Sequence, residues 1–322
     1  MKLEGRVYRG SSGRYWVHVP ADPTEYTVRL RGALKKDLVY TEGASMPRRV
    51  VNARKRRVTD PVTVGDLVVF DDEQNMIESV APRSAELARK SPSSGEQHVL
   101  VANLEALFCV VAAAHPAPDL WILDRFIVVA ENQEIRLEIV VNKCDRVESL
   151  AETRALFEPY DRMGYRIYYT SAKTGLGIDE LRERMRGRVA AFAGNSGVGK
   201  SSLLNAIQPG LTLKTGDLSE STQSGKHTTT QAELIPVIDG ESWLADTPGL
   251  RQLDFWQIDS GEVEYGFVEI HDRAHQCQFN NCTHRNEPGC AVMMAIGTGG
   301  VNERRWKSYL TLYEEATGTT RE

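Results

Sequence analysis

A glycine-rich stretch in the second half of the chain has the residue types of a loop that holds phosphate groups. Residues 194–201 read Gly-Asn-Ser-Gly-Val-Gly-Lys-Ser, between the apolar run Val189–Ala193 and the helical run Lys200–Ile207. In such a loop the glycines let backbone N–H groups surround the phosphates, and the next helix presents its positive end to them. Lys200 would reach the terminal phosphates, and the Ser201 hydroxyl would hold Mg²⁺.

Two later stretches fit magnesium and a γ-phosphate. Asp246 opens the sequence Asp-Thr-Pro-Gly, in which its carboxylate is placed to contact the magnesium shell and the Gly249 N–H to meet the γ-phosphate. Residues 215–230 are rich in Gly, Ser and Thr and lack apolar periodicity, which is typical of a switch loop that orders around a γ-phosphate. The sequence leaves two threonines of this loop as candidates for completing the magnesium shell, Thr228 and Thr229.

A third set of residues could recognise a base. Asn142-Lys143-Cys144-Asp145 follows an apolar run, and Asp145 could accept from the ring N1–H and the amine of guanine, which adenine lacks. The stem of Lys143 can cover the base. After another strand, Thr170-Ser171-Ala172-Lys173 would bring the Ala172 N–H to guanine O6. Asp145 and Ser171 are also ordinary helix-capping residues, but the two stretches together favour a guanine site.

The order of these stretches is unusual. In an ordinary GTPase the phosphate loop comes first, whereas here the base reader at 142–145 precedes the phosphate loop at 194–201. Strand pairing and the ligand crevice depend on spatial order, so a sheet tolerates relocated termini when the old ends lie close together. The sequence therefore predicts a rotated form of the usual domain.

Hydrolysis needs a residue that orients the attacking water. Many GTPases place a Gln directly after the Asp-x-x-Gly motif, but this chain has Leu250 there, which cannot hold water. His227 in the switch loop is the candidate for this role. A histidine in a polar loop can also be merely solvated, and that alternative stays open.

Four residues near the C-terminus form a possible zinc site. Cys277, Cys282, His284 and Cys290 supply three thiols and one imidazole, a full tetrahedral set that suits a structural rather than a catalytic ion. The alternative is a group of buried thiols with a surface histidine. His271 and His275 are possible substitute ligands.

Buried strands alternate with amphipathic helices over residues 98–260, which predicts a parallel α/β sheet carrying these loops. The expected strands are Leu107–Ala112, Leu137–Val141, Arg166–Thr170, Val189–Ala193 and Ser242–Ala245. The expected helices are Asp119–Ala130, Ser149–Arg162, Ile178–Arg186 and Lys200–Ile207, with a last one at Asn302–Ala316.

The N-terminal part has a different sequence pattern. Short strands and turns over residues 1–82 predict a small OB-like β-barrel, and 83–97 is expected to be a linker. Residues 1–60 carry fourteen Lys and Arg against six Asp and Glu, although the whole chain has a net charge of −5. This asymmetry fits either a solvated loop or a polyanion-binding surface. Residues 261–322 are expected to form a zinc-binding subdomain with a C-terminal helix.

Membrane insertion and disulfide bonding are not expected. The sequence has no run of about 18 apolar residues, and it is charged from its second residue. Five cysteines without a secretion signal favour reduced thiols or metal ligands, and Cys109 and Cys144 are expected to be buried. We therefore expect a cytoplasmic protein.

The rotated order and the cysteine segment resemble one family closely, the circularly permuted ribosome small subunit-dependent GTPases (ribosome biogenesis GTPase A). The resemblance covers nearly the whole chain and includes Ile122-Leu123-Asp124-Arg125 and Gly225-Lys226-His227-Thr228-Thr229-Thr230. It departs at Val268, where the family commonly has Pro. It implies that the four zinc candidates are ligands, that His227 is catalytic, and that the partner is the small ribosomal subunit late in its assembly.

The switch loop is expected to order only when a partner holds it, which predicts slow intrinsic GTP hydrolysis, and the resemblance implies that the small ribosomal subunit is the partner that stimulates it. We expect a monomer that uses Mg²⁺ with GTP and one structural zinc ion. The basic barrel would bind rRNA, with Tyr15, Trp16 and Tyr26 as stacking aromatics or, alternatively, as core. A competing hypothesis is a zinc-dependent RNA-binding module with a regulatory, weakly hydrolytic GTP site. The GTP-contacting candidates are Asn142, Lys143, Cys144, Asp145, Ser171, Ala172, Lys173, Gly194, Asn195, Ser196, Gly197, Val198, Gly199, Lys200, Ser201, Ser202 and Gly249.

Overall fold

The structure is a computed structural model that describes most of the chain in two compact units. It describes residues 1–31, 36–40, 50–55, 61–90, 97–210, 232–238, 240–246 and 258–318. One unit is formed by Met1–Leu104, Gly187–Val189 and Lys226–Phe255, and the other by Glu105–Arg186, Ala190–Gly225 and Trp256–Glu322. Each unit is described separately below.

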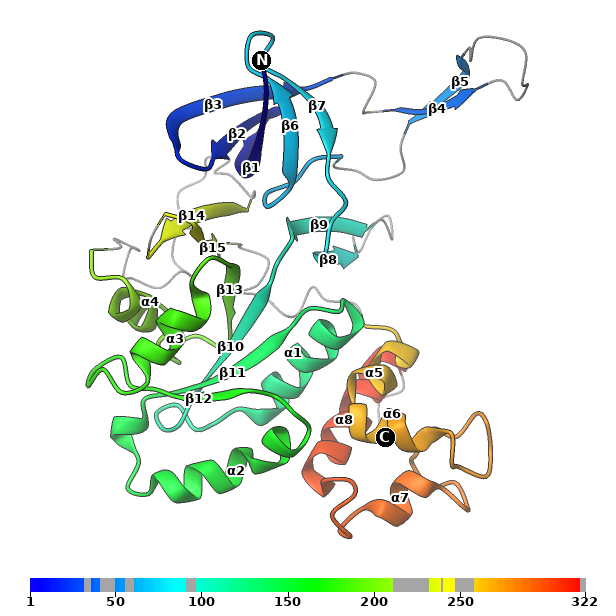
Figure 1. The fold of residues 1–322 in the computed structure, drawn as a ribbon. Helices are drawn as coiled ribbons and strands as arrows, with labels where there is room; N and C mark the ends of the chain where they lie inside the picture. The colour runs from blue at the N-terminus through cyan, green and yellow to red at the C-terminus, as the bar shows by residue number, and fades with distance from the viewer. Residues whose placement is uncertain are drawn as a thin grey trace, which may run out of the picture. The chain divides into compact units, whose positions relative to one another are not determined.

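The first unit is built on a five-stranded barrel (Figure 1, blue to cyan). Its strands are β1 (Lys2–Ser11), β2 (Arg14–Val19), β3 (Asp22–Leu30), β6 (Leu67–Asp71) and β7 (Met76–Val80). They follow the order β1-β2-β3-β7-β6, and β1 pairs with β6 to close the barrel. Only β3 and β7 run parallel. This is the strand order of an OB-fold, as expected from the sequence.

The barrel closes around apolar side chains, most of them aliphatic. Val7, Val17, Val28, Phe70 and Ile77 have no exposed surface and form its core. They come from every barrel strand, and each strand alternates between an inward and an outward face. Burial of these alternate positions fixes the register of the strands, because a slip by one residue would expose the apolar set.

In the described part of this unit, three hairpins accompany the barrel. They are β4 (Lys36–Tyr40) with β5 (Val50–Lys55), β8 (Glu86–Lys90) with β9 (Gln97–Ala102), and β14 (Glu233–Val237) with β15 (Ser242–Asp246). The stretch 83–97 was expected to be a linker, but it contains β8. Leu87 and Val101, paired across β8 and β9, are fully buried, so the hairpin has an apolar face of its own.

The second unit contains a parallel sheet of four strands in the order β12-β11-β10-β13. Their bounds are β10 (Ala106–Ala112), β11 (Leu137–Asn142), β12 (Ile167–Tyr169) and β13 (Val189–Ala193). Every residue of β10 and β11 is buried, which is typical of a parallel sheet covered on both faces. β13 is last in the sequence but pairs with β10, which is the rotated order in three dimensions.

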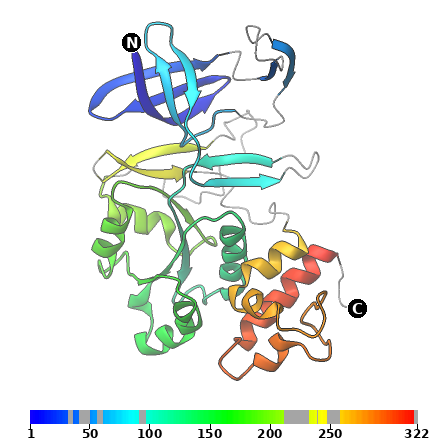
Figure 2. The ribbon, with the colours of Figure 1, turned by 45° about the vertical axis from the view of Figure 1, so that its right-hand side comes forward.

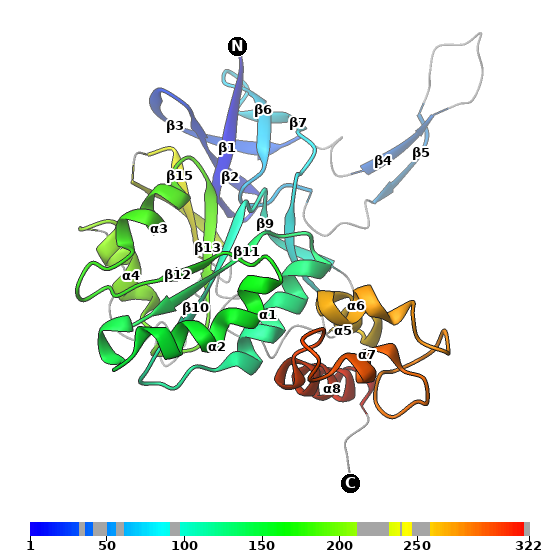
Figure 3. The same ribbon diagram turned by 60° about the horizontal axis from the view of Figure 1, so that its bottom comes forward.

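Helices cover both faces of this sheet (Figure 3). α1 (Leu120–Asn132) and α2 (Leu150–Arg162) lie on one face, and α3 (Ile178–Met185) and α4 (Lys200–Ile207) on the other. Right-handed crossovers require this arrangement, because the chain moves outward from β10 to β12 and then returns to β13. α1 and α2 begin where Asp119 and Ser149 accept hydrogen bonds from the Ile122 and Glu152 backbones, at 3.1 and 3.2 Å.

The C-terminal helices pack against α1 within the same unit (Figure 2, yellow to red). They are α5 (Ser260–Gly266), α6 (Val268–Ala274), α7 (Ala291–Ala295) and α8 (Glu303–Thr317). Val128 of α1 belongs to the same buried cluster as Phe267, Ile270 and Tyr309. The approach of α5 requires a glycine, because a Cβ on Gly266 would lie 2.5 Å from the Val128 Cα.

Ion pairs also join α1 to these helices. Asp124 and Arg305 are both fully buried, and Arg305 Nη1 lies 2.5 Å from Asp124 Oδ1. The same guanidinium donates from Nε to Glu269 of α6 at 2.6 Å, and Tyr160 of α2 donates to Asp124 at 2.7 Å. Burial alone would lower the pKa of Arg305, but Asp124 and Glu269 raise it above its ordinary value.

Among the described helices, none has the length and apolar character needed to cross a membrane.

Candidate nucleotide site and metal centre

The phosphate loop follows β13 and leads into α4, as the sequence predicted. Two of its glycines lie very close to residues of neighbouring strands, Val110 of β10 and Asn142 at the end of β11. A Cβ on Gly194 would lie 2.2 Å from the Val110 carbonyl oxygen, and one on Gly199 would lie 2.4 Å from Asn142 Nδ2. Both residues also have positive φ angles, 129° and 97°. The glycines are therefore required by packing as well as by backbone conformation.

Lys200 points back across the loop that precedes it. Its ammonium group donates hydrogen bonds to the carbonyls of Gly194 and Asn195, at 2.7 and 2.8 Å. This places a positive charge within the concave side of the loop, where the loop's own N–H groups would face an anion. Ser201 and Ser202 lie in the first turn of α4, beside this charge.

Asn142 connects three loops at the end of β11. Its Nδ2 donates to the Val198 carbonyl of the phosphate loop at 2.9 Å. Its Oδ1 accepts from the Ala172 backbone and from the Thr170 hydroxyl, both at 3.4 Å. The side chain is 1% exposed, so its amide serves to join these loops. The base-reading loop (142–145), the loop at 170–173, which we call the clamp loop, and the phosphate loop thus meet at one edge of the sheet, where parallel strands place their carboxyl ends.

Lys143 also reaches the phosphate loop. It adopts a left-handed conformation with φ of 63°, and its ammonium group donates to the carbonyls of Gly197 and His115. Burial lowers the pKa of Lys143, with a smaller contribution from Arg146. The stem of this side chain is thus stretched beside the loops, as needed to cover a base.

Asp145 is held by the clamp loop. Its Oδ1 accepts a hydrogen bond from the Ser171 hydroxyl at 2.6 Å, and this bond is the main cause of its lowered pKa. Ser171 is fully buried, while Asp145 is exposed. The carboxylate is therefore ionised and oriented, with its second oxygen available to a base. Lys173 is exposed, and Cys144 is buried with its thiol donating to the Val141 carbonyl at 3.3 Å.

Two residues beside the phosphate loop were not singled out from the sequence. Asp119, which caps α1, also accepts from Asn195 Nδ2 at 3.0 Å. His115 places its carbonyl at the Lys143 ammonium group. Asp119 was expected only to begin a helix, and no local pattern relates it to a residue 76 positions away.

Other sequence-predicted residues fall elsewhere. Asp246 ends β15 in the first unit. Ser196 and Gly197 are exposed and Val198 is buried within the phosphate loop. His227, Thr228, Thr229 and Gly249 lie outside the described residues.

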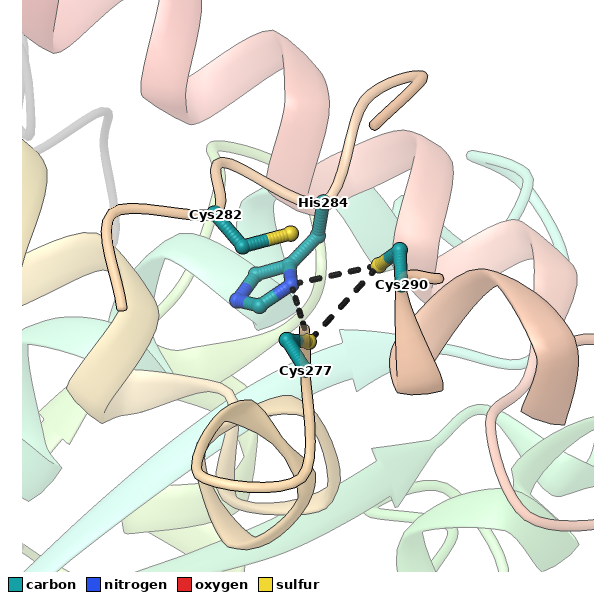
Figure 4. A group of neighbouring side chains, drawn as sticks. All are labelled: Cys277, Cys282, His284 and Cys290. Atoms are coloured by element: carbon teal, nitrogen blue, oxygen red, sulfur yellow. Dashed lines mark hydrogen bonds between the residues drawn. The ribbon is translucent and has the colours of Figure 1, made fainter. Parts of the chain in front are cut away.

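The four zinc candidates form one cluster (Figure 4). The ligand atoms of Cys277, Cys282, His284 and Cys290 all lie within 4.8 Å of one another. Cys277 Sγ is 3.9 Å from Cys290 Sγ, and His284 Nδ1 is 3.5 and 3.4 Å from these two sulfurs. His271 and His275 are outside the cluster.

These separations fit a zinc ion. With metal–sulfur bonds of about 2.3 Å and a metal–nitrogen bond of about 2.0 Å, tetrahedral geometry sets edges of about 3.8 Å between sulfurs and about 3.5 Å between sulfur and nitrogen. The opposite ring nitrogen of His284 faces Glu264 at 3.5 Å, a carboxylate placed to fix the orientation of the ring. Three thiols and an imidazole leave no coordination position open, so the group suits a structural ion.

The parallel sheet and the loops at its edge define a class of protein. A phosphate loop that follows the last strand of the sheet, with the Asn-Lys-x-Asp loop earlier in the chain, is the arrangement of a circularly permuted GTPase. Comparison with known proteins gives the family. The sequence model described as RsgA GTPase matches residues 80–256. The chain belongs to this family, and it is a GTP hydrolase.

Relatives match over the full length of the chain. The small ribosomal subunit biogenesis GTPase RsgA of Moorella thermoacetica is 40% identical over 320 residues, covering 99% of each chain. The protein of the same name from Gemmatimonas aurantiaca is 37% identical over 98% of this chain and 97% of its own. These similarities confirm the resemblance that the sequence motifs indicated.

Solved structures support the same fold. The crystal structure of YjeQ from Thermotoga maritima has a TM-score of 0.76 at 32% identity and covers all of both chains. The structure of YloQ, described as a circularly permuted GTPase, has a TM-score of 0.70 at 28% identity, covering 100% of this chain and 97% of its own. The predicted fold class, a permuted GTPase domain with an N-terminal barrel and a C-terminal metal cluster, is confirmed.

Proposed function

We propose that this GTPase binds the small ribosomal subunit late in its maturation, and that the subunit stimulates hydrolysis. The relatives that match along the whole chain are named for the biogenesis of that subunit. The observation that carries the proposal to this chain is a row of arginines around a tryptophan on the outward face of the barrel. The alternative, an RNA-binding module that barely hydrolyses GTP, is not favoured by a chain-long match to GTPases.

The register of the barrel strands defines this surface. Arg9 of β1 pairs with Trp16 of β2, which pairs with Thr27 of β3. Two positions along the strands, Arg14 pairs with Arg29. Positions two apart share one face of a sheet, so these five residues form one strip, which we call the arginine strip.

The arginine strip has the chemistry of an RNA-binding surface. Arg9, Arg14 and Arg29 are exposed, and the Arg9 guanidinium lies 4.5 Å from the centroid of the Trp16 ring. Arginine binds phosphates and stacks on aromatic rings, and a tryptophan can stack on an unpaired base. Tyr15 and Tyr26, the other aromatic candidates, pack against the barrel core. Trp16 is therefore our candidate for base stacking, and single-stranded rRNA is the proposed partner of this strip.

Guanine nucleotide would lie along the carboxyl edge of the parallel sheet. Asp145 would accept from the base, the Ala172 N–H would donate to its O6, and residues 194–202 would surround the phosphates. Lys200 would move its ammonium group from the loop carbonyls to the terminal phosphates. Mg²⁺, held by oxygens of Ser201, Asp246 and either Thr228 or Thr229, would neutralise phosphate charge.

His227 would orient the attacking water, because Leu250 cannot do so. We expect His227→Ala to lower turnover about 100-fold while GTP affinity changes by about twofold or less. His275→Ala is the matched control, since His275 is exposed and outside the metal cluster. Single-turnover hydrolysis and equilibrium nucleotide binding measure the two quantities. Unchanged turnover in His227→Ala would exclude this role.

The proposed partner is tested by GTP turnover with and without purified small subunits. We expect strong stimulation, and we expect Trp16→Ala to weaken subunit binding about tenfold, the loss expected for one stacked base. Basal turnover should be unchanged, because Trp16 lies on the barrel. The proposal would be contradicted if small subunits did not change GTP turnover. It would also be contradicted if the affinity for subunits were the same with and without Trp16 and with and without nucleotide. Localisation to the cytoplasm and a monomeric state belong to the same proposal.

A further inference from the structure

The hairpin that carries Asp246 is part of the barrel sheet. Its first strand, β14, pairs with β1 at Glu233 and Arg9. Within the hairpin, Glu233 pairs in turn with Asp246. A single cross-strand row therefore runs from Thr27 and Trp16 through Arg9 and Glu233 to Asp246. The arginine strip and the end of β15 are two parts of one hydrogen-bonded sheet.

Trp243 fixes this hairpin to the barrel with its ring. The indole is 4% exposed and stacks on Tyr8 of β1, with ring centroids 6.1 Å apart and planes at 23°. On β2, the His18 ring meets the indole edge-on at 5.1 Å. A buried indole between two rings of adjacent strands resists sliding of β15 along the barrel.

The backbone at Trp243 is held from another side. The Trp243 N–H donates to the Arg188 carbonyl at 2.8 Å, and the buried Ser242 hydroxyl accepts from the Gly187 N–H at 2.8 Å. Residues 187–189 run directly into β13 and the phosphate loop. Trp243 thus contacts the barrel through its ring, and through its backbone it contacts Arg188, the residue just before β13.

We propose that Trp243 is a positioning residue for Asp246, which it holds in register with the arginine strip so that RNA bound there sets the magnesium site. The inference rests on the proposed function for the roles of Asp246 and of the strip. Trp243 lies three residues before Asp246 on one strand, so a shift of its ring moves the carboxylate. Positioning of this kind affects the magnesium requirement and the stimulated rate more than nucleotide binding.

The first experiment needs no ribosomes. In the full chain, we expect Trp243→Ala to raise the Mg²⁺ concentration for half-maximal basal turnover about tenfold, as for other residues that orient a metal ligand. GDP affinity in EDTA should stay within about twofold, and Trp243→Phe should restore most of the magnesium response. Trp121→Ala is the matched control, because Trp121 packs against the buried cluster that α1 shares with the C-terminal helices of the other unit.

The second experiment measures stimulation. At saturating small subunits, Trp243→Ala should lower the stimulated rate about tenfold beyond any loss of binding, because small displacements of reacting groups are costly. Tyr8→Leu with His18→Leu removes the ring contacts while leaving β15 intact, and it should act in the same direction. If thermal melting shows that Trp243→Ala does not fold, this double variant tests the inference in its place.

The outcomes separate the inference from the proposed function. If Asp246→Asn raises the magnesium requirement and neither Trp243→Ala nor the Tyr8 and His18 variant does, the inference is overturned and the role of Asp246 stands. If Asp246→Asn has no effect, the assigned magnesium role is wrong and the inference falls with it. If subunits do not stimulate the wild type, the proposed partner is wrong, and the magnesium experiment still decides whether Trp243 positions Asp246.

Discussion

At the scale of single residues, the side chains proposed to bind guanine are hydrogen-bonded to one another and to the neighbouring loops. Asn142 joins the base-reading loop to the phosphate loop, and Ser171 donates to Asp145. The ionised, oriented Asp145 carboxylate is therefore available without rearrangement. Such preorganisation strengthens binding because the ordering cost is met during folding.

Base specificity is predicted to change in Asp145→Asn. The amide would lose the charge-assisted bonds to guanine, which contribute about 1.5–3 kcal/mol each, so GTP affinity should fall at least about 100-fold. Xanthine carries an oxygen in place of the guanine amine, and it can accept from the new amide. Competition of XTP with GTP measures the switch. Equal preference for GTP in wild type and variant would contradict the assignment of Asp145.

The pKa of Asp145 predicts how base binding depends on pH. The Ser171 hydroxyl holds that pKa below its ordinary value, so the carboxylate stays ionised as pH falls toward the ordinary pKa of aspartate, about 3.9. The hydrogen bonds proposed between Asp145 and guanine should be present above that value and should be lost only as pH falls through the lowered pKa. The Asp145 contribution to GTP affinity should therefore be flat from neutral to mildly acidic pH.

At the scale of elements, a buried charge network attaches the C-terminal helices α6 and α8 to α1 of the GTPase core. Asp124 and Glu269 balance Arg304 and Arg305, and the Asp124–Arg305 pair has no exposed surface. Removing one partner from such a pair leaves a buried charge unpaired. α1, α6 and α8 are therefore expected to move together.

We predict that Asp124→Asn lowers the free energy of unfolding by about 3–5 kcal/mol, the usual cost of breaking a buried pair. Glu303→Gln is the control, because Glu303 pairs with Lys307 on the surface, with side chains 60% and 65% exposed. That change should cost at most about 1 kcal/mol. Chemical denaturation at neutral pH measures both. If both changes lowered the free energy of unfolding equally, the buried network would contribute no more to stability than a surface pair.

Zinc removal is predicted to loosen α8. Trp306 Nε1 donates to the His284 carbonyl at 2.9 Å, and the Tyr309 hydroxyl donates to the Thr283 carbonyl at 3.1 Å. Both carbonyls belong to the segment 277–290, which carries the proposed zinc ligands, so we expect them to move when zinc is removed. We expect about one zinc per chain, and a red shift of fluorescence on chelation that Trp306→Phe abolishes. Cys282→Ser should behave like the chelated wild type.

Elements with a strong local pattern could be predicted from the sequence. β13 and α4 were predicted to the residue, because an apolar run, a glycine loop and a helical run follow each other. The β4–β5 and β8–β9 hairpins were missed. β4, β5 and β8 are rich in charged residues, and β8 is stabilised by its pairing with β9 across a stretch that has the composition of a linker.

The candidate site was predictable to the extent that its residues lie in motifs. The loops at 142–145, 170–173 and 194–201 were found because backbone chemistry constrains their residue types. The contacts of Asp119 with Asn195 and of Asp124 with Arg305 were not, since their partners are 76 and 181 positions away. Such pairs depend on how helices pack, which no single stretch encodes.

At the scale of the whole molecule, charge separation is predicted to govern subunit binding. A chain of net charge −5 presents three exposed arginines on one barrel face. The slope of log affinity against log salt should fall by about one unit in Arg29→Ala if Arg29 contacts a phosphate. Arg162→Ala, on α2 of the other unit, should leave the slope unchanged. Subunit pelleting over a salt series measures it, and equal slopes in all three proteins would place the RNA elsewhere.

The strand order also bears on how the protein is made. Synthesis delivers β10, β11 and β12 before β13, yet β10 pairs with β13 along one edge. Until Val189–Ala193 leaves the ribosome, that edge of the wholly apolar strand Ala106–Ala112 is open to other chains. Nascent chains exposing residues only to Arg186 should bind chaperones more than chains exposing Ile207, which pull-down of arrested translation complexes would measure. The finished sheet is indifferent to where the gene begins, but the growing chain is not.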